Sequence, residues 1–150
     1  MARRSARAAA VQMVYESMLG GDGGEETLRE LIEFTPEGND QAYIDSIVNG
    51  VREKAAELDE IISAHLVGWT LERISRVDLS ILRAAIYELT YIKDSPESVI
   101  CSEAVALANR FSTENSGRFI NGVLGAFLRG ENKAETEKPA EDMPKEDAQA

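Results

Sequence analysis

Three arginines, Arg3, Arg4 and Arg7, stand near the start of the chain and are the only charged side chains among its first fifteen residues. On a helix, Arg3 and Arg7 share a face one turn apart, with Arg4 beside them. The helix dipole disfavours cations at this end by roughly a few tenths of a kcal/mol. Arginine binds phosphate bidentately and stacks on bases, and the free N–H groups of a helix start also bind anions. The cluster therefore favours a nucleic-acid contact, with a solvated basic helix end as the alternative.

Two further side chains on the same expected helix suit unpaired bases. Gln12 and Tyr15 lie away from the apolar stripe that includes Ala6 and Met13. They offer an amide for hydrogen bonding and an aromatic ring for stacking, which are the groups that hold single-stranded RNA.

The residue types needed for catalysis or metal binding are scarce. His65 and Cys101 are the only histidine and cysteine, which excludes an internal disulfide framework and a cysteine-based zinc site. We interpret His65 as a structural group at a helix end and Cys101 as a small core residue. The glycines between residues 20 and 24 follow a helix and lack the Lys-Ser/Thr ending of a phosphate loop. The sequence thus predicts no enzyme, no metal and no cofactor.

Charge is distributed unevenly along this acidic chain. The 150 residues carry 16 Lys and Arg against 27 Asp and Glu, a formal net charge of −11 that repels RNA away from the immediate contact. Residues 131–150 hold seven acids, three lysines and two prolines. We expect this tail to be disordered and to aid solubility, or alternatively to compete with RNA for the basic arm.

The length and hydropathy bound the class of protein. A chain of 150 residues fits one domain. No apolar run approaches the ~18–20 residues that cross a bilayer, and the N-terminus lacks the apolar segment of a secretory signal. We therefore expect a cytoplasmic protein without a membrane partner.

Apolar residues recur at i, i+3 and i+4 throughout the chain before residue 130, and no segment alternates as a strand would. The pattern predicts an all-α fold of about seven helices. One domain is expected over 1–130, with two packed helical halves at about 1–66 and 70–130. The expected helices include 3–19, 25–34, a long one over 40–66, a short one over 71–76, one that begins at Asp78, and two more after Pro96.

Several residues are expected to shape these helices. Thr70, Asp78 and Ser95 are predicted N-caps, and Pro96 is predicted at the first position of the helix that follows. Gly50 costs about 1 kcal/mol inside the long helix, which we attribute to a close helix crossing or a bend.

Four blocks occur in order across residues 3–128. They are Arg3-Arg4-x-Ala6-Arg7-x-x-Ala10-Val11-Gln12-x-x-Tyr15; Gly68-Trp69 with Arg73-Ile74; Asp78-x-x-Ile81-Leu82-Arg83-x-Ala85-x-Tyr87-Glu88-Leu89; and Glu103-Ala104-Val105-x-Leu107-Ala108-x-x-Phe111 with Ser116-x-x-Phe119-Ile120-Asn121-Gly122-Val123-Leu124. Taken together, these blocks resemble the NusB family of bacterial transcription antitermination factors.

The resemblance implies an all-α fold of two helical subdomains without catalytic activity. It implies binding of the boxA element of ribosomal-RNA leader transcripts, together with the small-subunit ribosomal protein that acts as NusE, on elongating RNA polymerase. By position, the implied RNA contacts are Arg3, Arg4, Arg7, Gln12 and Tyr15, with Asn115, Arg118 and Phe119 as weaker candidates. The implied contacts to the protein partner are Asp78, Arg83, Tyr87 and Glu88. Their structural alternatives are a helix cap for Asp78, a salt bridge for Arg83 and Glu88, and packing for Tyr87.

One position departs from the family pattern. Ser5 stands where a further arginine is common, so the basic cluster is thin. With about three phosphate contacts on single-stranded RNA, the log–log salt slope would be only about −2. We therefore expect weak RNA binding by the chain alone, with a partner that supplies more basic surface.

Three alternatives stay open at this point. A similar helical domain precedes some ribosomal-RNA cytosine methyltransferases, but the chain ends in an acidic tail where a Gly-rich catalytic domain would follow. A protein-only helical adaptor would keep its activity after neutralisation of Arg3, Arg4 and Arg7. A homodimer that covers the RNA surface is compatible with the main interpretation.

Overall fold

The computed structural model describes residues 2–19, 40–93 and 95–130, and these residues form helices without strands. The helices are α1 (Ala2–Met18), α3 (Asp40–Glu53), α4 (Ala55–Ala64), α5 (Arg76–Tyr87), α6 (Glu97–Phe111) and α7 (Ser116–Leu128). A 3-10 turn (Leu71–Arg73) precedes α5, and a π-helical turn (Glu88–Ile92) extends it. The predicted all-α fold is confirmed. The helix expected over 25–34 and the tail at 131–150 lie outside the described residues.

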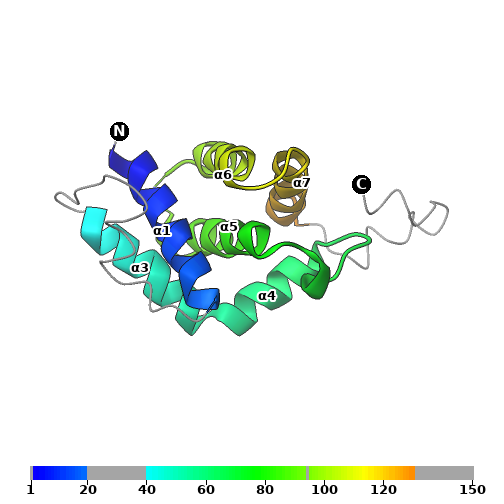
Figure 1. The fold of residues 1–150 in the computed structure, drawn as a ribbon, viewed down its shortest axis with the longest axis horizontal. Helices are drawn as coiled ribbons and strands as arrows, with labels where there is room; N and C mark the ends of the chain where they lie inside the picture. Colours follow the sequence, from blue (N-terminus) through cyan, green and yellow to red (C-terminus); the bar gives the residue numbers. More distant parts are fainter. Residues whose placement is uncertain (1, 20–39, 94, 131–150) are drawn as a thin grey trace.

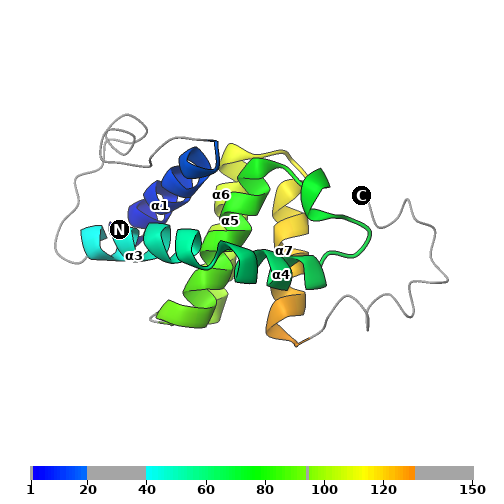
Figure 2. The ribbon, with the colours of Figure 1, turned by 90° about the horizontal axis from the view of Figure 1, so that it is seen from below.

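Helix α5 lies at the centre and contacts each of the other labelled helices. α1 and α3 pack together on one side of it, and α6 and α7 pack together on another (Figure 1). Seen from below, α3 and α4 follow one another along one side of the molecule and cross α5 (Figure 2). None of the described helices is long and apolar enough to cross a bilayer.

The core forms where the apolar stripes of these helices meet. Burying each large aliphatic side chain contributes roughly 1.5–3 kcal/mol, so these stripes account for the packing of the helices on α5. The apolar residues that recur at i, i+3 and i+4 in the sequence supply these buried positions. The large aliphatic side chains that are buried almost completely are Ile44, Ile47, Leu58, Ile62, Leu66, Ile81, Leu82, Ile86, Ile100, Ile120 and Leu124.

The long helix predicted over 40–66 is divided at Lys54, where the backbone has φ −106° and ψ 18°. The hydrogen bonds continue through this point, since the Lys54 N–H donates to the Gly50 carbonyl at 2.8 Å and the Leu58 N–H donates to the Lys54 carbonyl at 2.8 Å. Gly50 itself faces the ring of Tyr87 from α5, and a Cβ at this position would overlap that ring. Of the two explanations given for Gly50, a close helix crossing or a bend, the contact with Tyr87 supports the close crossing.

The start of α5 differs from the prediction. Ser75, not Asp78, is the N-cap, and its Oγ accepts a hydrogen bond from the Asp78 N–H at 3.0 Å. A serine three residues earlier can cap the same helix end, and this leaves the Asp78 carboxylate free for another contact.

Two other predicted caps are also corrected. Thr70 precedes only the turn Leu71–Arg73 and makes no side-chain cap bond. Pro96 takes the N-cap position of α6 that was predicted for Ser95. The Ser95 hydroxyl instead accepts a hydrogen bond from Arg7, at 2.9 Å from Nη2.

Candidate nucleic-acid interface

The first turns of α1 place Arg4 at the surface. Its side chain is 69% exposed, and its Nε lies 4.0 Å from Glu103 Oε2 on α6. A contact at this distance is a loose ion pair, and an exposed pair of this kind contributes at most about 1 kcal/mol. The Arg4 guanidinium is therefore available to an anion. Arg3 lies in the same turn of α1.

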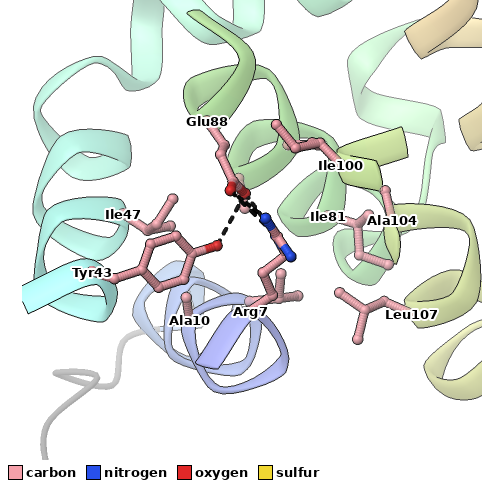
Figure 3. Close-up of a pocket in the computed structure, with 12 residues that line it drawn as sticks. Arg7, Ala10, Tyr43, Ile47, Ile81, Glu88, Ile100, Ala104 and Leu107 are labelled. Atoms are coloured by element: carbon pink, nitrogen blue, oxygen red, sulfur yellow. Dashed lines mark hydrogen bonds and ion pairs between the residues drawn. The ribbon is translucent and has the colours of Figure 1, made fainter. Parts of the chain in front are cut away.

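Arg7 has a different environment, because its side chain enters the interior between α1, α5 and α6. It lies among aliphatic groups that include Ile81, Ile100 and Leu107, beside a small cavity of about 20 Å³ (Figure 3). Only 7% of the side chain is exposed. The expectation that Arg7 stands with Arg4 on the outer surface is therefore corrected.

The guanidinium of Arg7 is held by two carboxylates. Its Nε and Nη2 donate to Glu88 at 3.0 and 2.7 Å, and its Nη1 donates to Glu103 at 2.7 Å. Burial alone lowers the pKa of Arg7, but the hydrogen bond to Glu88, the electrostatic interactions with Tyr43 and Glu88 and the bond to Glu103 together raise it above its ordinary value. Arg7 is thus a permanently charged link between three helical segments.

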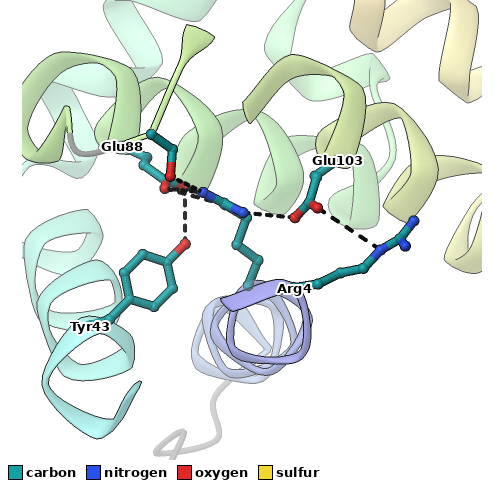
Figure 4. A network of polar contacts seen from close by, with 6 residues as sticks. Arg4, Tyr43, Glu88 and Glu103 are labelled. Atoms are coloured by element: carbon teal, nitrogen blue, oxygen red, sulfur yellow. Dashed lines mark hydrogen bonds and ion pairs between the residues drawn. The ribbon is translucent and has the colours of Figure 1, made fainter. Parts of the chain in front are cut away.

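Glu88 completes this buried network (Figure 4). It is 2% exposed and accepts a further hydrogen bond from the Tyr43 hydroxyl at 3.0 Å, which joins α3 to the network. Because a buried unpaired carboxylate is costly, the bonds from Arg7 and Tyr43 are what allow Glu88 to remain there. The position of Glu88 corrects the expectation that it faces a protein partner at the surface.

The other three residues predicted to contact a protein partner have structural contacts of their own. Asp78 is 7% exposed, and its Oδ2 accepts a hydrogen bond from Ser116 Oγ at 2.9 Å. Arg83 forms a bidentate pair with Asp59 on α4, with N–O distances of 2.8 and 2.7 Å. Tyr87 is half-buried, and its ring centroid lies 5.0 Å from that of Tyr91.

A groove between α1 and α6 adds a basic residue that the sequence reasoning missed. The groove has a volume of about 230 Å³ and is lined by Arg4 and Ser5 from α1 and by Glu103, Leu107 and Arg110 from α6, together with Ala8 and Ala106. Arg110 is exposed in the last turn of α6, with its guanidinium 4.8 Å from the centroid of the Phe111 ring. Arg110 lies shortly before Asn115 in the sequence, and this nearness to a predicted RNA contact could have identified it.

The candidates at the start of α7 surround a second pocket. Asn115 and Phe119 line a space of about 280 Å³ together with Trp69 and Arg73 from the loop before α5. The rings of Trp69 and Phe119 have centroids 6.0 Å apart, and the Arg73 guanidinium lies 5.8 Å from the Trp69 ring. Aromatic rings and arginine planes are the surfaces on which unpaired bases stack. Arg118 is exposed in the first turn of α7.

The two groups of predicted RNA contacts lie on different helices of the fold. α6 lies between α1 and α7 (Figure 1), and it packs against α7 and shares the basic groove with α1. Gln12 and Tyr15 are both partly buried in the later turns of α1. The structure thus brings Arg4 together with Arg110, and Asn115 together with Phe119.

His65 and Cys101 have surroundings that suit structural roles. His65 is the C-cap of α4, where its Nδ1 donates to the Ile61 carbonyl at 2.7 Å and its ring packs edge-on against Phe127. Burial and the nearby charge of Glu97 raise the pKa of the Cys101 thiol. Within the described ranges, no group of three or more His, Cys, Asp and Glu side chains could hold a metal ion.

The fold and the exposed arginines define an all-helical binding protein, and comparison with known proteins identifies its family. The NusB family model matches residues 4–129, and the chain belongs to the NusB family. It is 39% identical over 137 residues to the transcription antitermination protein NusB of Ruminiclostridium cellulolyticum, covering 91% of this chain and 94% of that protein.

Solved structures show the same fold. NusB of T. maritima matches with a TM-score of 0.76 and 33% identity, over 92% of this chain and 98% of that one. A crystal structure of the antitermination factors NusB and NusE in complex with dsRNA contains a chain that matches with a TM-score of 0.73 and 26% identity. That match covers 85% of this chain and 96% of the other.

Proposed function

We propose that this protein is a transcription antitermination factor that binds boxA-type single-stranded RNA of ribosomal-RNA leader transcripts. In this proposal it acts with the ribosomal protein NusE and joins elongating RNA polymerase to suppress termination. The observation that carries the proposal is the family match over residues 4–129, nearly all of the described chain. A similar chain that was crystallised with NusE and dsRNA supports NusE and RNA as binding partners.

We divide the proposed RNA contacts into residues that touch RNA and a residue that positions them. We assign direct contact to Arg3, Arg4, Gln12 and Tyr15 on α1 and to Asn115, Arg118 and Phe119 on α7. Arg7 is proposed as a positioning residue, because its guanidinium is bonded to Glu88 and Glu103 inside the protein. It would orient the turn that carries Arg4 without touching RNA.

The proposal also includes the absence of catalysis, the location of the protein and its organisation. We propose a regulatory binding role without catalysis, which is supported by a relative named for transcription antitermination. Since bacterial transcription takes place in the cytoplasm, we propose that location. We propose that residues 1–130 form a single domain of two helical halves, followed by an acidic tail. We also propose that a homodimer can cover the RNA surface.

Fluorescence anisotropy tests the proposal with two labelled RNAs, one boxA-like and one with the same bases shuffled. The full chain is titrated with and without NusE. We expect preferential binding of the boxA RNA, weak for the chain alone and tighter with NusE. Absence of binding to either RNA in the presence of NusE would contradict the RNA role and favour the protein-only adaptor.

Two variants locate the contact. Arg4→Gln removes an exposed charge at the N-terminal end of α1 and should weaken RNA binding. Arg52→Gln is the matched control, since Arg52 is exposed at the end of α3, where its Nη2 donates to Ser17 Oγ near the opposite end of α1. Equal affinities for the two variants would exclude Arg4 from the interface.

A further inference from the structure

We propose that the groove between α1 and α6 is a phosphate site in which Arg4 and Arg110 hold the same phosphodiester of the RNA backbone. This inference rests on the proposed RNA-binding function and names a residue and a ligand group for it. The groove encloses about 230 Å³ and has an arginine on each helix. Guanidinium groups bind phosphate oxygens through short, paired, charge-assisted hydrogen bonds.

Both arginines are free to turn toward an anion. Arg4 is 69% exposed, and its only described ion pair, with Glu103, is 4.0 Å long. Arg110 is exposed, and its described contact is with the face of its neighbour Phe111, which leaves the hydrogen-bond donors of its guanidinium available. The two side chains therefore have donors to offer to a group that enters between them.

Glu103 does not prevent an anion from binding, because its negative charge is already paired with Arg7. Its Oε1 accepts a 2.7 Å hydrogen bond from Arg7, which also pairs with Glu88. The three arginines of this region face two glutamates, which leaves one net positive charge beside the groove. A phosphodiester carries one negative charge and would neutralise it.

The two sides of the groove are held rigidly, which favours a defined site. Arg7 is bonded to Glu88 at the end of α5 and to Glu103 on α6, so it ties the first turns of α1 to the wall that carries Arg110. A site whose walls are fixed before binding loses less entropy when the ligand arrives. The phosphate site is thus built on the buried network that removes Arg7 from the surface.

The test uses the full chain with NusE, the boxA and shuffled RNAs, and the variants Arg110→Gln, Arg4→Gln and the two combined. Phosphate contacts carry no sequence information, so Arg110→Gln should weaken both RNAs equally, by about tenfold, and reduce the salt slope by about 0.7. Arg110→Lys, which keeps the positive charge, should retain most of the dependence of RNA affinity on salt concentration. Arg52→Gln controls for loss of a surface charge elsewhere.

The double variant tests the shared phosphate. If Arg4 and Arg110 hold one phosphodiester, removing either arginine already disturbs the shared contact. The fold-loss in RNA affinity of the double variant should then be smaller than the product of the two single fold-losses. Independent effects would overturn the shared site, and an Arg110→Gln variant that binds like Arg52→Gln would overturn any phosphate site at Arg110. Either result with boxA preference intact leaves the proposed function standing. If the unsubstituted chain with NusE binds boxA and shuffled RNA equally well, the proposed function itself is contradicted.

Discussion

Arg4 and Arg7 lie one turn apart on α1 and have opposite surroundings. The Arg4 side chain is 69% exposed beside an open groove, whereas the Arg7 side chain is 7% exposed and bonded to two carboxylates. The inner side of α1 therefore uses arginine to hold the fold together, and the outer side presents arginine to a ligand. Residue type alone does not separate these roles, because the partners of Arg7 are 81 and 96 residues away in the chain.

The difference also shows how the interface is supported. A buried arginine with paired carboxylates connects helices and permits little movement, while an exposed arginine keeps its side-chain freedom until a ligand binds. In this protein Glu103 joins the two regions, because it accepts a hydrogen bond from Arg7 and lines the groove with Arg4 (Figure 4). The inner region thus determines where the outer one can present its charge.

The largest expected effect comes from removing the buried arginine. Arg7→Met leaves Glu88 buried without its main partner and should lower the free energy of unfolding by about 3 to 5 kcal/mol. Arg4→Met is the matched control and should change it by less than about 0.5 kcal/mol. Urea unfolding followed by circular dichroism measures both. Similar losses for the two variants would remove the distinction between inner and outer arginines.

A smaller effect is expected at two helical glycines with contrasting surroundings. Gly50→Ala places a Cβ against the Tyr87 ring and should cost about 1 to 2 kcal/mol, because that ring must move from its contact with Tyr91. Gly122→Ala has nothing within 4 Å of the added Cβ and should stabilise α7 by up to about 1 kcal/mol. Thermal unfolding of the two variants gives the signs. A stabilising Gly50→Ala would show that the α3–α5 crossing tolerates expansion.

The cap of α5 should contribute less. Ser75→Ala removes the acceptor for the Asp78 N–H and should cost about 1 kcal/mol. Thr70→Ala removes a hydroxyl that makes no cap bond and should leave stability nearly unchanged. Denaturant midpoints distinguish the two. A larger loss for Thr70→Ala would restore the sequence-based view of that residue as a cap.

The last test requires no substitution and compares the two candidate RNA surfaces. Trp69 is the single tryptophan and lines the pocket that contains Asn115 and Phe119. If a base stacks in that pocket, RNA should quench the Trp69 fluorescence at the concentrations at which anisotropy reports binding. Binding without any change in the tryptophan signal would restrict the interface to α1 and α6.

The sequence determined the helical class, the apolar stripes and the family. The spacing of Ile44, Ile47 and Val51 along α3 follows the helical period, and such a stripe is buried wherever the helix packs, so it can be predicted without knowing the neighbours. The close crossing at Gly50 was also indicated, since an interior glycine needs a reason. Arg4 was singled out by the basic cluster at the start of the chain, and Asn115 and Arg118 by the resemblance to the family; all three are exposed.

Only the tertiary structure decided which polar side chains are internal. Arg7 lies in a stretch of α1, residues 6–11, that neighbouring helices bury on every side, and the carboxylates of Glu88 and Glu103 pair with it there. The family resemblance implied a partner contact for Asp78 and Glu88, with a helix cap and a salt bridge as the structural alternatives, but Ser116 and Arg7 from other helices cover them. The groove with Arg110 likewise exists only once α6 packs beside α1. Local periodicity reports which face of a helix is apolar, whereas ion pairs between distant segments depend on the packing of all the helices together.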